Sequence, residues 1–331
     1  MTKILVTGGC GFLGQHLVRE LAKKNVSIDI IDLNCPDNIE FPQGVNVHTG
    51  VDLCQFEQIE PYVKNKDVVI HLAGIVSFSI KDKDLLYNVN TVGTENVCKA
   101  MSQNDVRSLI HISSVAALGY NNDKDNPIDE DFLFDWNIAH KRKKYYMISK
   151  YNADKVIKSY DSINATILYP GLMFGPGDRT NAPKLINAIK KNRIPFNMPG
   201  GTNIIDVRDV VQGILAVLDK QITNEHILLS GHNISFKELN SVIAKVVNTQ
   251  PPKKTVPVIA NGLLFNILLS CERLSNKKLQ LTADNVDSAF KFRYFKNNKA
   301  KYLLDWTTTF SFENSIIDTV AWMEENGLSD W

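Results

Sequence analysis

Residues 3–14 read Lys3-Ile4-Leu5-Val6-Thr7-Gly8-Gly9-Cys10-Gly11-Phe12-Leu13-Gly14, and this stretch decides the fold of the 331-residue chain. An apolar run leads into a glycine-rich turn, and Leu17, Val18 and Leu21 follow at helical spacing, which predicts a strand, a turn and a helix. Glycines let the backbone approach a pyrophosphate, whose charge is met by free amide groups and the positive end of the helix dipole. We therefore expect a dinucleotide to contact Gly8, Cys10, Gly11, Phe12, Leu13 and Gly14.

The segment after the loop indicates which dinucleotide is bound. A second strand is predicted over residues 27–31, and Asp32 follows it at the distance from the loop where a ribose-binding carboxylate belongs. A carboxylate there accepts hydrogen bonds from the adenosine ribose and repels a 2′-phosphate. Residues 33–35 contain no arginine or lysine that would reverse this preference. The glycine spacing fits two dinucleotide families, so Asp32 carries the prediction of NAD rather than NADP.

Tyr146 and Lys150 form a candidate catalytic pair. Positions four apart lie above one another on a helix, so the Lys150 ammonium can approach the Tyr146 hydroxyl and favour the phenolate. The spacing is common in amphipathic helices and gains meaning only beside a cofactor site. Tyr145 competes, but the residue four positions after it is Ser149 rather than a lysine.

Strands and helices alternate through the first half of the chain. Strands are predicted over residues 45–48, 67–72, 108–113 and 165–169, and helices over residues 55–63, 85–101 and 146–158. Such alternation predicts an α/β fold, a Rossmann-type doubly wound parallel sheet covered by helices on both faces. We expect a cofactor domain over residues 1–170 with a return segment near 203–230, and a smaller mixed α/β substrate lobe over residues 171–202 and 231–331.

Composition excludes several classes of function. The 37 basic and 36 acidic residues give no electrostatic footprint for nucleic acid. The five cysteines contain no Cys-x-x-Cys pair and the histidines do not cluster, which argues against a metal site and against a disulfide framework. A reducing cytoplasm fits this pattern, and a strand starting at residue 3 leaves no room for a signal peptide. The apolar stretch 256–269 is too short to span a membrane, and we expect a buried or lid helix there.

With these residues assembled, the chain resembles the extended short-chain dehydrogenase/reductase family over nearly its whole length. The loop matches the family's Thr-Gly-x-x-Gly-x-x-Gly pattern, and residues 90–94 resemble its Asn-x-x-Gly-Thr helix motif. Four further segments follow in the family's order: residues 52–53, 71–74, 113–114 and 170–178. The resemblance implies cofactor contacts from Asp52, Leu53, Leu72, Ala73, Gly74, Asn90, Ser113, Tyr146, Lys150 and Pro170.

The resemblance also implies a mechanism. Tyr146 would donate a proton to a carbonyl oxygen, or remove one from a hydroxyl, while hydride passes between the substrate carbon and the nicotinamide. Lys150 would lower the pKa of the tyrosine and hold the nicotinamide ribose. Ser114 would orient the reacting oxygen, and Ser113 is the alternate because one step along a strand end turns a side chain to the opposite face. A homodimer built on the helices of residues 90–101 and 146–158 is a further implication.

The substrate is predicted from a departure from the family pattern. Sugar-nucleotide enzymes of the family carry a diphosphate-binding arginine where this chain has Thr202, so a strong charge-assisted contact is missing. Four cations of the second lobe could replace it: Lys184, Lys190, Lys191 and Arg193. Residues 12–14 and the Ser113-Ser114 pair resemble the branch containing 3β-hydroxysteroid dehydrogenases and dihydroflavonol-reductase-like enzymes. An apolar substrate would suit Val76, Phe78, Leu118 and Met173.

We therefore predict an NAD(P)-dependent enzyme that interconverts a secondary alcohol and a ketone on a small, largely apolar substrate. Two alternatives stay open: a nucleotide-sugar epimerase or dehydratase that retains NAD, and a non-catalytic protein that senses the cofactor. Of the remaining features, the basic run 140–144 is expected to be solvated, and the helix over residues 312–322 is expected to pack in a core. His71 and His111 are expected to be core or strand-end histidines with satisfied hydrogen bonds.

Overall fold

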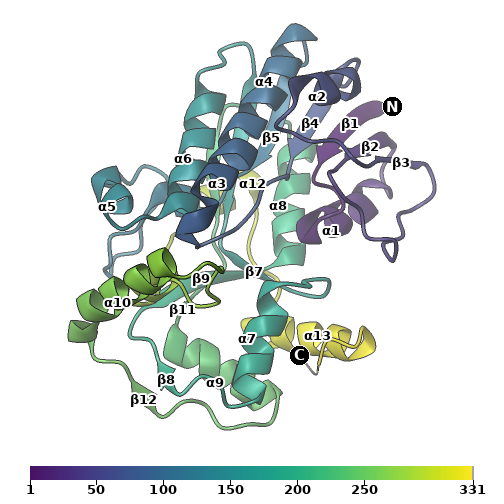
Figure 1. Cartoon of the computed structure of the whole chain (residues 1–331). Coiled ribbons are helices and arrows are strands. Elements are labelled where there is room, and N and C mark those ends of the chain that lie inside the picture. Colours follow the sequence, from purple (N-terminus) through teal and green to yellow (C-terminus); the bar gives the residue numbers. More distant parts are fainter. Residues whose placement is uncertain (330–331) are drawn as a thin grey trace.

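The central element of the computed structural model, which describes residues 1–329, is a seven-stranded sheet (Figure 1). The strands are β1 (Thr2–Thr7), β2 (Val26–Ile31), β3 (Val45–His48), β4 (Val68–His71), β5 (Ser108–Ile112), β6 (Asn164–Pro170) and β10 (His226–Leu229). They lie in the order β10-β6-β5-β4-β1-β2-β3, and every neighbouring pair is parallel. The predicted doubly wound fold is confirmed. The strand order reverses between β1 and β4, which is where such folds bind ligands at the carboxyl ends of the strands.

Helices cover both faces of this sheet. One face packs against α1 (Phe12–Leu21) and α8 (Val207–Asp219), and the other against α2 (Phe56–Val63), α4 (Gly93–Gln103) and α6 (Tyr145–Lys158). The stripe predicted on α1 is its buried face, because Leu17, Val18 and Leu21 have no solvent exposure. Each face therefore has its own apolar core, and the site must lie at the edges of these layers.

The helix predicted over residues 85–101 is interrupted. It consists of α3 (Lys83–Leu86), a π-helical turn η2 (Tyr87–Val92) and α4. The Thr91 hydroxyl donates a 3.0 Å hydrogen bond to the Ser149 carbonyl, and the Asn90 amide also reaches the hydroxyl of Ser149 at 3.0 Å. π-Turns are common at functional sites, and this one turns two polar side chains toward the helix that carries Tyr146.

A second lobe surrounds a smaller sheet. Its strands are β7 (Leu172–Phe174), β9 (Gly201–Asp206) and β11 (His232–Ser235), in the order β11-β9-β7. Its helices α7 (Asn181–Lys190), α9 (Phe236–Val246) and α13 (Phe312–Glu325) enclose a separate apolar core that includes Phe174, Ile243 and Ile316. Ile316 is fully buried as predicted, whereas Ile317 is 45% exposed. The C-terminal helix thus contributes a narrower stripe to the core than the sequence indicated.

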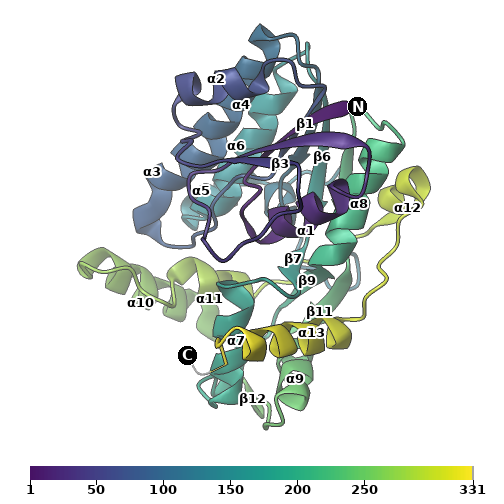
Figure 2. The ribbon, with the colours of Figure 1, turned by 90° about the vertical axis from the view of Figure 1, so that its right-hand side faces the viewer.

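The other elements are short or lie at the edge of the molecule. They are η1 (Ile80–Asp82), η3 (Val115–Leu118), α5 (Trp136–Lys141), β8 (Phe196–Asn197), β12 (Lys254–Thr255), η4 (Val258–Ala260), α10 (Asn261–Leu274), α11 (Ala283–Ala289) and α12 (Asn298–Leu304). Figure 2 shows α10 and α11 beside one another at one side of the second lobe.

Helix α10 bears on the prediction of a buried or lid helix over residues 256–269. Burial is wrong for most of it, and the lid alternative stays a prediction. Only Phe265 and Glu272 of this helix are buried, and Leu263 is 66% exposed. Polar contacts contribute to holding it, because the Glu272 carboxylate accepts hydrogen bonds from the amides of Ile80 at 3.3 Å and Ala283 at 2.9 Å. Among residues 1–329, no helix combines the length and apolar character that crossing a membrane requires.

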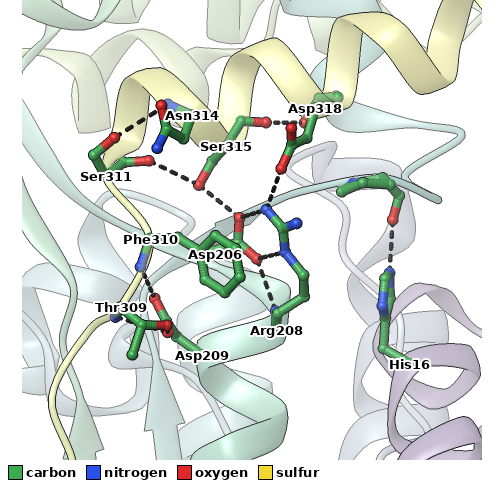
Figure 3. A network of polar contacts seen from close by, with 12 residues as sticks. His16, Asp206, Arg208, Asp209, Thr309, Phe310, Ser311, Asn314, Ser315 and Asp318 are labelled. Carbon is green, nitrogen blue, oxygen red and sulfur yellow. Dashed lines mark hydrogen bonds and ion pairs between the residues drawn. The ribbon is translucent and has the colours of Figure 1, made fainter.

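A polar network joins the second lobe to α8 (Figure 3). The Arg208 guanidinium donates two 2.8 Å hydrogen bonds to the Asp206 carboxylate and pairs with Asp318 of α13 at 2.7 Å. Asp206 also accepts a 2.6 Å hydrogen bond from the Ser315 hydroxyl of the same helix. One further residue, the fully buried Asp209, accepts hydrogen bonds from both the amide and the hydroxyl of Thr309. The network fixes the position of α13 against the sheet.

Candidate active site

The glycine loop between β1 and α1 has a backbone that only glycine fits. Gly8 has a φ of +72°, and a Cβ atom there would lie 2.7 Å from the backbone of Ala73. A Cβ atom at Gly14 would lie 2.5 Å from the Gly9 carbonyl oxygen. No side chain caps the N-terminus of α1, so the amides of its first turn are left for an anionic ligand. The loop therefore fits the pyrophosphate group that the sequence predicted.

Asp32 stands at the end of β2, beside this loop. Its carboxylate accepts a 3.1 Å hydrogen bond from the Cys10 amide, so one oxygen is already oriented by the glycine loop. Burial raises the pKa of Asp32, and three backbone amides partly oppose that effect by stabilising the carboxylate. The geometry suits the predicted hydrogen bonds to an adenosine ribose, because the acid lies next to the loop without being enclosed by it.

The cysteines correct another prediction. Cys10 and Cys35 form a disulfide, with Cα atoms 5.2 Å apart, although the sequence argued against disulfides. The two residues follow neighbouring parallel strands, β1 and β2, so their sheet positions bring them together although 25 positions separate them in sequence. The bond links the glycine loop directly to the segment after Asp32. Spacing rules for Cys-x-x-Cys pairs do not detect such a contact.

The segment after β4 is held by Thr7, at the end of β1, and by Asn90. The Leu72 amide donates to the Thr7 carbonyl at 3.1 Å, and the Ala73 amide donates to the Thr7 hydroxyl at 3.3 Å. The Asn90 side chain accepts from the Ile75 amide at 2.8 Å and donates to the Ile75 carbonyl at 3.0 Å. Asn90 is buried and positions this segment through these bonds, and its predicted contact with the cofactor stays a prediction.

The remaining predicted cofactor residues lie along the same edge of the sheet. Asp52 follows β3, and its carboxylate accepts a 2.9 Å hydrogen bond from the Cys54 amide. Leu53 is buried, and a Cβ atom added at Gly93 of α4 would lie 3.1 Å from the Cβ atom of Leu53. Gly74 is exposed just after β4, and Pro170 ends β6. The structure thus brings these residues to the carboxyl ends of strands, as a cofactor site requires.

Ser114, Tyr146 and Lys150 come together at the carboxyl end of β5. The Ser114 hydroxyl hydrogen-bonds Tyr146, which lies in the first turn of α6. The Ser113 hydroxyl instead donates a 2.7 Å hydrogen bond to the Asp154 carboxylate. The two serines thus face different partners, and only Ser114 is placed to share a substrate oxygen with Tyr146. Lys150 is buried, and its ammonium donates to the Ile112 carbonyl at 3.0 Å.

Opposing effects set the pKa of Tyr146. Burial raises the pKa of Tyr146, and the Ser114 hydrogen bond and the Arg293 charge oppose this effect. The Lys150 ammonium donates to the Ile112 carbonyl, and its predicted effect on the pKa of Tyr146 stays a prediction. Burial lowers the pKa of Lys150 to about 8, with the Asp154 charge acting in the opposite direction. The same burial raises the pKa of Asp154 to about 6. The cation that favours a Tyr146 phenolate in this structure is Arg293.

The basic run 140–144 is only partly solvated. Lys144 is fully buried, and its ammonium contacts the carboxylates of Asp284 and Asp287 and the Ser288 hydroxyl, each at 2.9 Å. Burial acts to lower the pKa of Lys144, but the two carboxylates raise it above its ordinary value. The prediction of a solvated run was therefore wrong for Lys144. Its side chain joins the start of the Tyr146 helix to α11.

The two core histidines have different environments. His71 has the expected partners, with Nδ1 2.6 Å from the Thr7 hydroxyl and Nε2 3.0 Å from the Thr94 hydroxyl. Neither ring nitrogen of His111 has a hydrogen-bond partner within residues 1–329, and Nε2 lies 3.8 Å from the Asp154 carboxylate. Burial lowers the pKa of His71 to about 3 and that of His111 well below its ordinary value. The prediction of satisfied histidines holds for His71 and was wrong for His111.

The substrate side of the site is partly apolar. The Phe78 ring meets the Tyr146 ring edge to face, with centroids 5.9 Å apart. Leu118 is buried and Met173 is partly buried, whereas Val76 is 53% exposed. Thr202 is buried in β9. The four cations considered as substitutes for the missing arginine are all exposed: Lys184, Lys190, Lys191 and Arg193.

Sequence reasoning did not single out Asp154 or Arg293. Asp154 lies four positions after Lys150, so the helical spacing that identified the Tyr146 and Lys150 pair could also have found it. Arg293 lies 147 positions after Tyr146, since 293 minus 146 is 147, and no motif in the sequence points to it. Only the folding of the second lobe against the first brings its charge to the tyrosine.

A parallel sheet, a glycine loop with an uncapped helix, and a tyrosine beside a serine and a buried lysine define an enzyme of the extended short-chain dehydrogenase/reductase type. The resemblance seen in the sequence is confirmed by a family model that matches residues 4–230. The chain belongs to the NAD dependent epimerase/dehydratase family. NAD is therefore the cofactor, as Asp32 predicted.

Individual relatives cover nearly the whole chain. Sterol-4-alpha-carboxylate 3-dehydrogenase, decarboxylating, from Bos taurus is 28% identical over 334 residues, which cover 95% of this chain and 90% of that protein. An N-acetyl-alpha-D-glucosaminyl-diphospho-ditrans,octacis-undecaprenol 4-epimerase from Escherichia coli O157:H7 is 25% identical, covering 97% of this chain and 99% of that protein. The crystal structure of gox2253 is 23% identical, has a TM-score of 0.81 and covers 99% of both chains. That last similarity shows the fold alone.

Proposed function

We propose that this enzyme interconverts a secondary alcohol and a ketone on a small, largely apolar molecule. The observation that carries the proposal is that the Ser114 hydroxyl lowers the pKa of Tyr146, whose ring meets the Phe78 ring at a steep angle with centroids 5.9 Å apart. This places two hydroxyl groups that can hold one substrate oxygen next to an apolar wall. Residues 1–170 and 203–230 would bind the cofactor, and the rest of the second lobe would bind the substrate.

The chain's own residues supply the proton chemistry. The glycine loop and Asp32 would hold NAD, which would supply the acceptor or the donor of the hydride. Tyr146 removes the proton from the substrate hydroxyl during oxidation and returns it to the carbonyl oxygen during reduction. Ser114 donates a hydrogen bond to the same oxygen and fixes its orientation. Lys150, whose pKa is about 8, would bind the hydroxyls of the nicotinamide ribose. The charge of Asp154 favours the charged form of Lys150.

An epimerase or dehydratase is the second candidate, favoured by the similarity to the undecaprenol-linked sugar epimerase. The charges on the substrate side weigh against it. The Thr202 position has no cation, and the guanidinium of Arg208 is engaged by Asp206 and Asp318. A diphosphate would therefore lack the bidentate arginine that binds it best. The dimer on α4 and α6 and the cytoplasmic location stay predictions.

The decisive experiment measures turnover and cofactor release together. The purified enzyme is incubated with NAD and 3β-hydroxysteroids, with NADH and steroid or flavonoid ketones, and separately with uridine-diphosphate sugars. We expect net formation or consumption of NADH only with the alcohols and ketones. Conversion of a sugar nucleotide without net change in NADH would favour the epimerase instead.

A tyrosine pair supplies the matched control. Tyr146→Phe should lower kcat by about 100- to 10,000-fold, because it removes the hydroxyl that transfers the proton. The dissociation constant of NAD, measured by calorimetry, should change little. Tyr145→Phe, one position earlier, should keep its activity. If Tyr146→Phe turns over as fast as the wild type, the assignment of the proton-transfer residue is wrong.

A further inference from the structure

The disulfide lies inside the cofactor site, where two bonds join the glycine loop to the segment that follows β2. Cys10 stands between Gly9 and Gly11, and its amide donates a 3.1 Å hydrogen bond to the Asp32 carboxylate. Its sulfur is bonded to Cys35, three positions after Asp32. The backbone and the side chain of one loop residue therefore both hold the turn that carries the ribose-binding carboxylate.

The segment of residues 35–40 has few other ties to the protein. It contains no strand or helix, and most of its residues are exposed. Within residues 1–329, no hydrogen bond joins this segment to another element, because the Ile39 amide donates to the Pro36 carbonyl inside it, at 3.0 Å. The disulfide and the partial packing of Cys35 and Phe41 against the core on the α1 side of the sheet hold the segment beside the loop.

The two cysteines differ in exposure. Cys10 is only 4% exposed, whereas Cys35 is partly exposed. An incoming thiolate therefore reaches Cys35 and releases Cys10. Cys10 directly precedes Gly11, the N-cap of α1, and no side chain caps this helix. The positive end of a helix stabilises a thiolate, and a stabilised thiolate leaves faster, although the Asp32 carboxylate acts in the opposite direction.

We propose that the Cys10–Cys35 bond is a reversible redox site through which a low-molecular-weight thiol and its disulfide control the affinity for NAD. In the disulfide form, Asp32 and the glycine loop are held together before NAD binds. In the dithiol form, residues 35–40 are released and must be ordered again on binding, which weakens it. The inference concerns the cofactor site alone and does not depend on the substrate.

The exchange needs only the thiol and its disulfide. A thiolate attacks the Cys35 sulfur, the bond between the two sulfurs breaks, and Cys10 leaves as a thiolate that takes up a proton. A second thiolate attacks the sulfur of the small thiol in the mixed disulfide, and Cys35 leaves in the same way. The protein disulfide is thus reduced to two thiols, while two small thiols are oxidised to one disulfide. Oxidation of the protein is the reverse sequence.

Calorimetry with NAD on the whole chain tests the proposal. One sample is kept as the disulfide, and the other is reduced with excess glutathione and desalted without oxygen. Alkylation in denaturant, followed by intact-mass measurement, should add groups at Cys54, Cys98 and Cys271 in both samples, and at Cys10 and Cys35 only in the second. We expect the dithiol form to bind NAD about 5- to 50-fold more weakly. Equal affinity, tighter binding by the dithiol form, or a bond that glutathione does not reduce would each overturn the proposal.

Two cysteine variants separate the bond from other effects of the reductant. Cys35→Ala cannot form the disulfide and should bind NAD as weakly as the dithiol wild type, with or without glutathione. Cys271→Ser, at an exposed position of α10, is the matched control and should keep the full difference between the two forms. Tight binding by Cys35→Ala would show that the disulfide is a structural tie without influence on the cofactor.

Linkage provides an independent check. If the disulfide strengthens NAD binding by a given factor, saturating NAD must shift the thiol–disulfide equilibrium of the protein toward the disulfide by the same factor. The same alkylation measures this equilibrium in mixtures of reduced and oxidised glutathione, with and without NAD. An equilibrium that NAD does not move contradicts the proposal. Neither measurement uses turnover, so both results stand even if the proposed alcohol and ketone chemistry fails.

Discussion

Two cations near Tyr146 show opposite solutions to the burial of charge. Lys144 has no solvent exposure and contacts two carboxylates and a hydroxyl, each at 2.9 Å. Arg293 is partly buried and has no ionic partner within residues 1–329. Both lie close enough to Tyr120 to lower its pKa, against the larger opposing effect of burial.

A buried cation that is paired within the chain and one that is not have different consequences for the stability of the protein. A buried charge that is paired within the chain leaves nothing for a ligand to contribute. Removing it leaves its partners buried without a counter-charge, which lowers the stability of the fold. An unmatched charge costs stability in the free protein, and a ligand of opposite sign offsets that cost. We therefore read the Lys144 cluster, formed with Asp284, Asp287 and Ser288, as the connection between α6 and α11. The Nε of Arg293, by contrast, has no hydrogen-bond partner within residues 1–329.

The largest effect on stability should come from breaking the Lys144 cluster. Lys144→Met should lower the free energy of unfolding by about 3–5 kcal/mol, because two aspartates lose their buried counter-charge. Urea unfolding followed by circular dichroism measures this loss. Lys141→Met, at an exposed position of the same basic run, should change the free energy by less than about 0.5 kcal/mol. A loss in Lys144→Met no larger than in this control would break the comparison.

A smaller effect is expected from Asp154, which accompanies the other buried lysine. Its pKa of about 6 lies above the ordinary value of 3.8, so between these two pH values the folded state binds more protons than the unfolded state. Stability contributed by the protonated acid is therefore present at pH 4 and is lost as the pH rises to 6. Asp154→Asn should remove this dependence, shifting the difference between variant and wild type by about 2–3 kcal/mol across the window.

Unfolding curves at several pH values between 4 and 6 measure that shift. Asp161→Asn, at an exposed position just after the same helix, is the control and should leave the pH dependence unchanged. If Asp154→Asn and Asp161→Asn follow the wild type in parallel, Asp154 is not the group that titrates.

The smallest effect, and one of opposite sign, is expected from Arg293. Arg293→Met should leave the free energy of unfolding unchanged or raise it by up to about 1 kcal/mol, because an unmatched cation gives way to an apolar side chain. The same urea unfolding measurement applies. A loss above about 2 kcal/mol would mean that Arg293 supports the fold as Lys144 does, and the contrast between the two cations would disappear.

Local patterns predicted most of the cofactor half. Three contiguous segments carry the prediction: the glycine loop, the strand that ends before Asp32, and the helix with Tyr146 and Lys150. Their periodicity and turn residues predict their structure. The family model and the sheet order confirm the fold and the cofactor that these segments indicated. The catalytic roles of Ser114, Tyr146 and Lys150 stay predictions, although the structure brings the three residues together.

The features that the sequence could not reveal depend on contacts between distant segments. Cys10 and Cys35 meet because β1 and β2 are neighbours, and Lys144 loses its water because α11 covers it. The spacing of charges within residues 140–144 cannot distinguish a covered lysine from a solvated one. Helix α10 was predicted as a buried or lid helix because its composition is apolar, and tertiary packing leaves most of its surface exposed.

The path of residues 306–316 has a consequence for the folding of the two halves of the molecule. Trp306 fills the core beneath α1 and α8, and its indole donates a 2.9 Å hydrogen bond to the Asp209 carbonyl. A few residues later, Phe312 and Ile316 fill the core of the second lobe. Neither core is complete without this short stretch. Its docking therefore completes both halves of the molecule together.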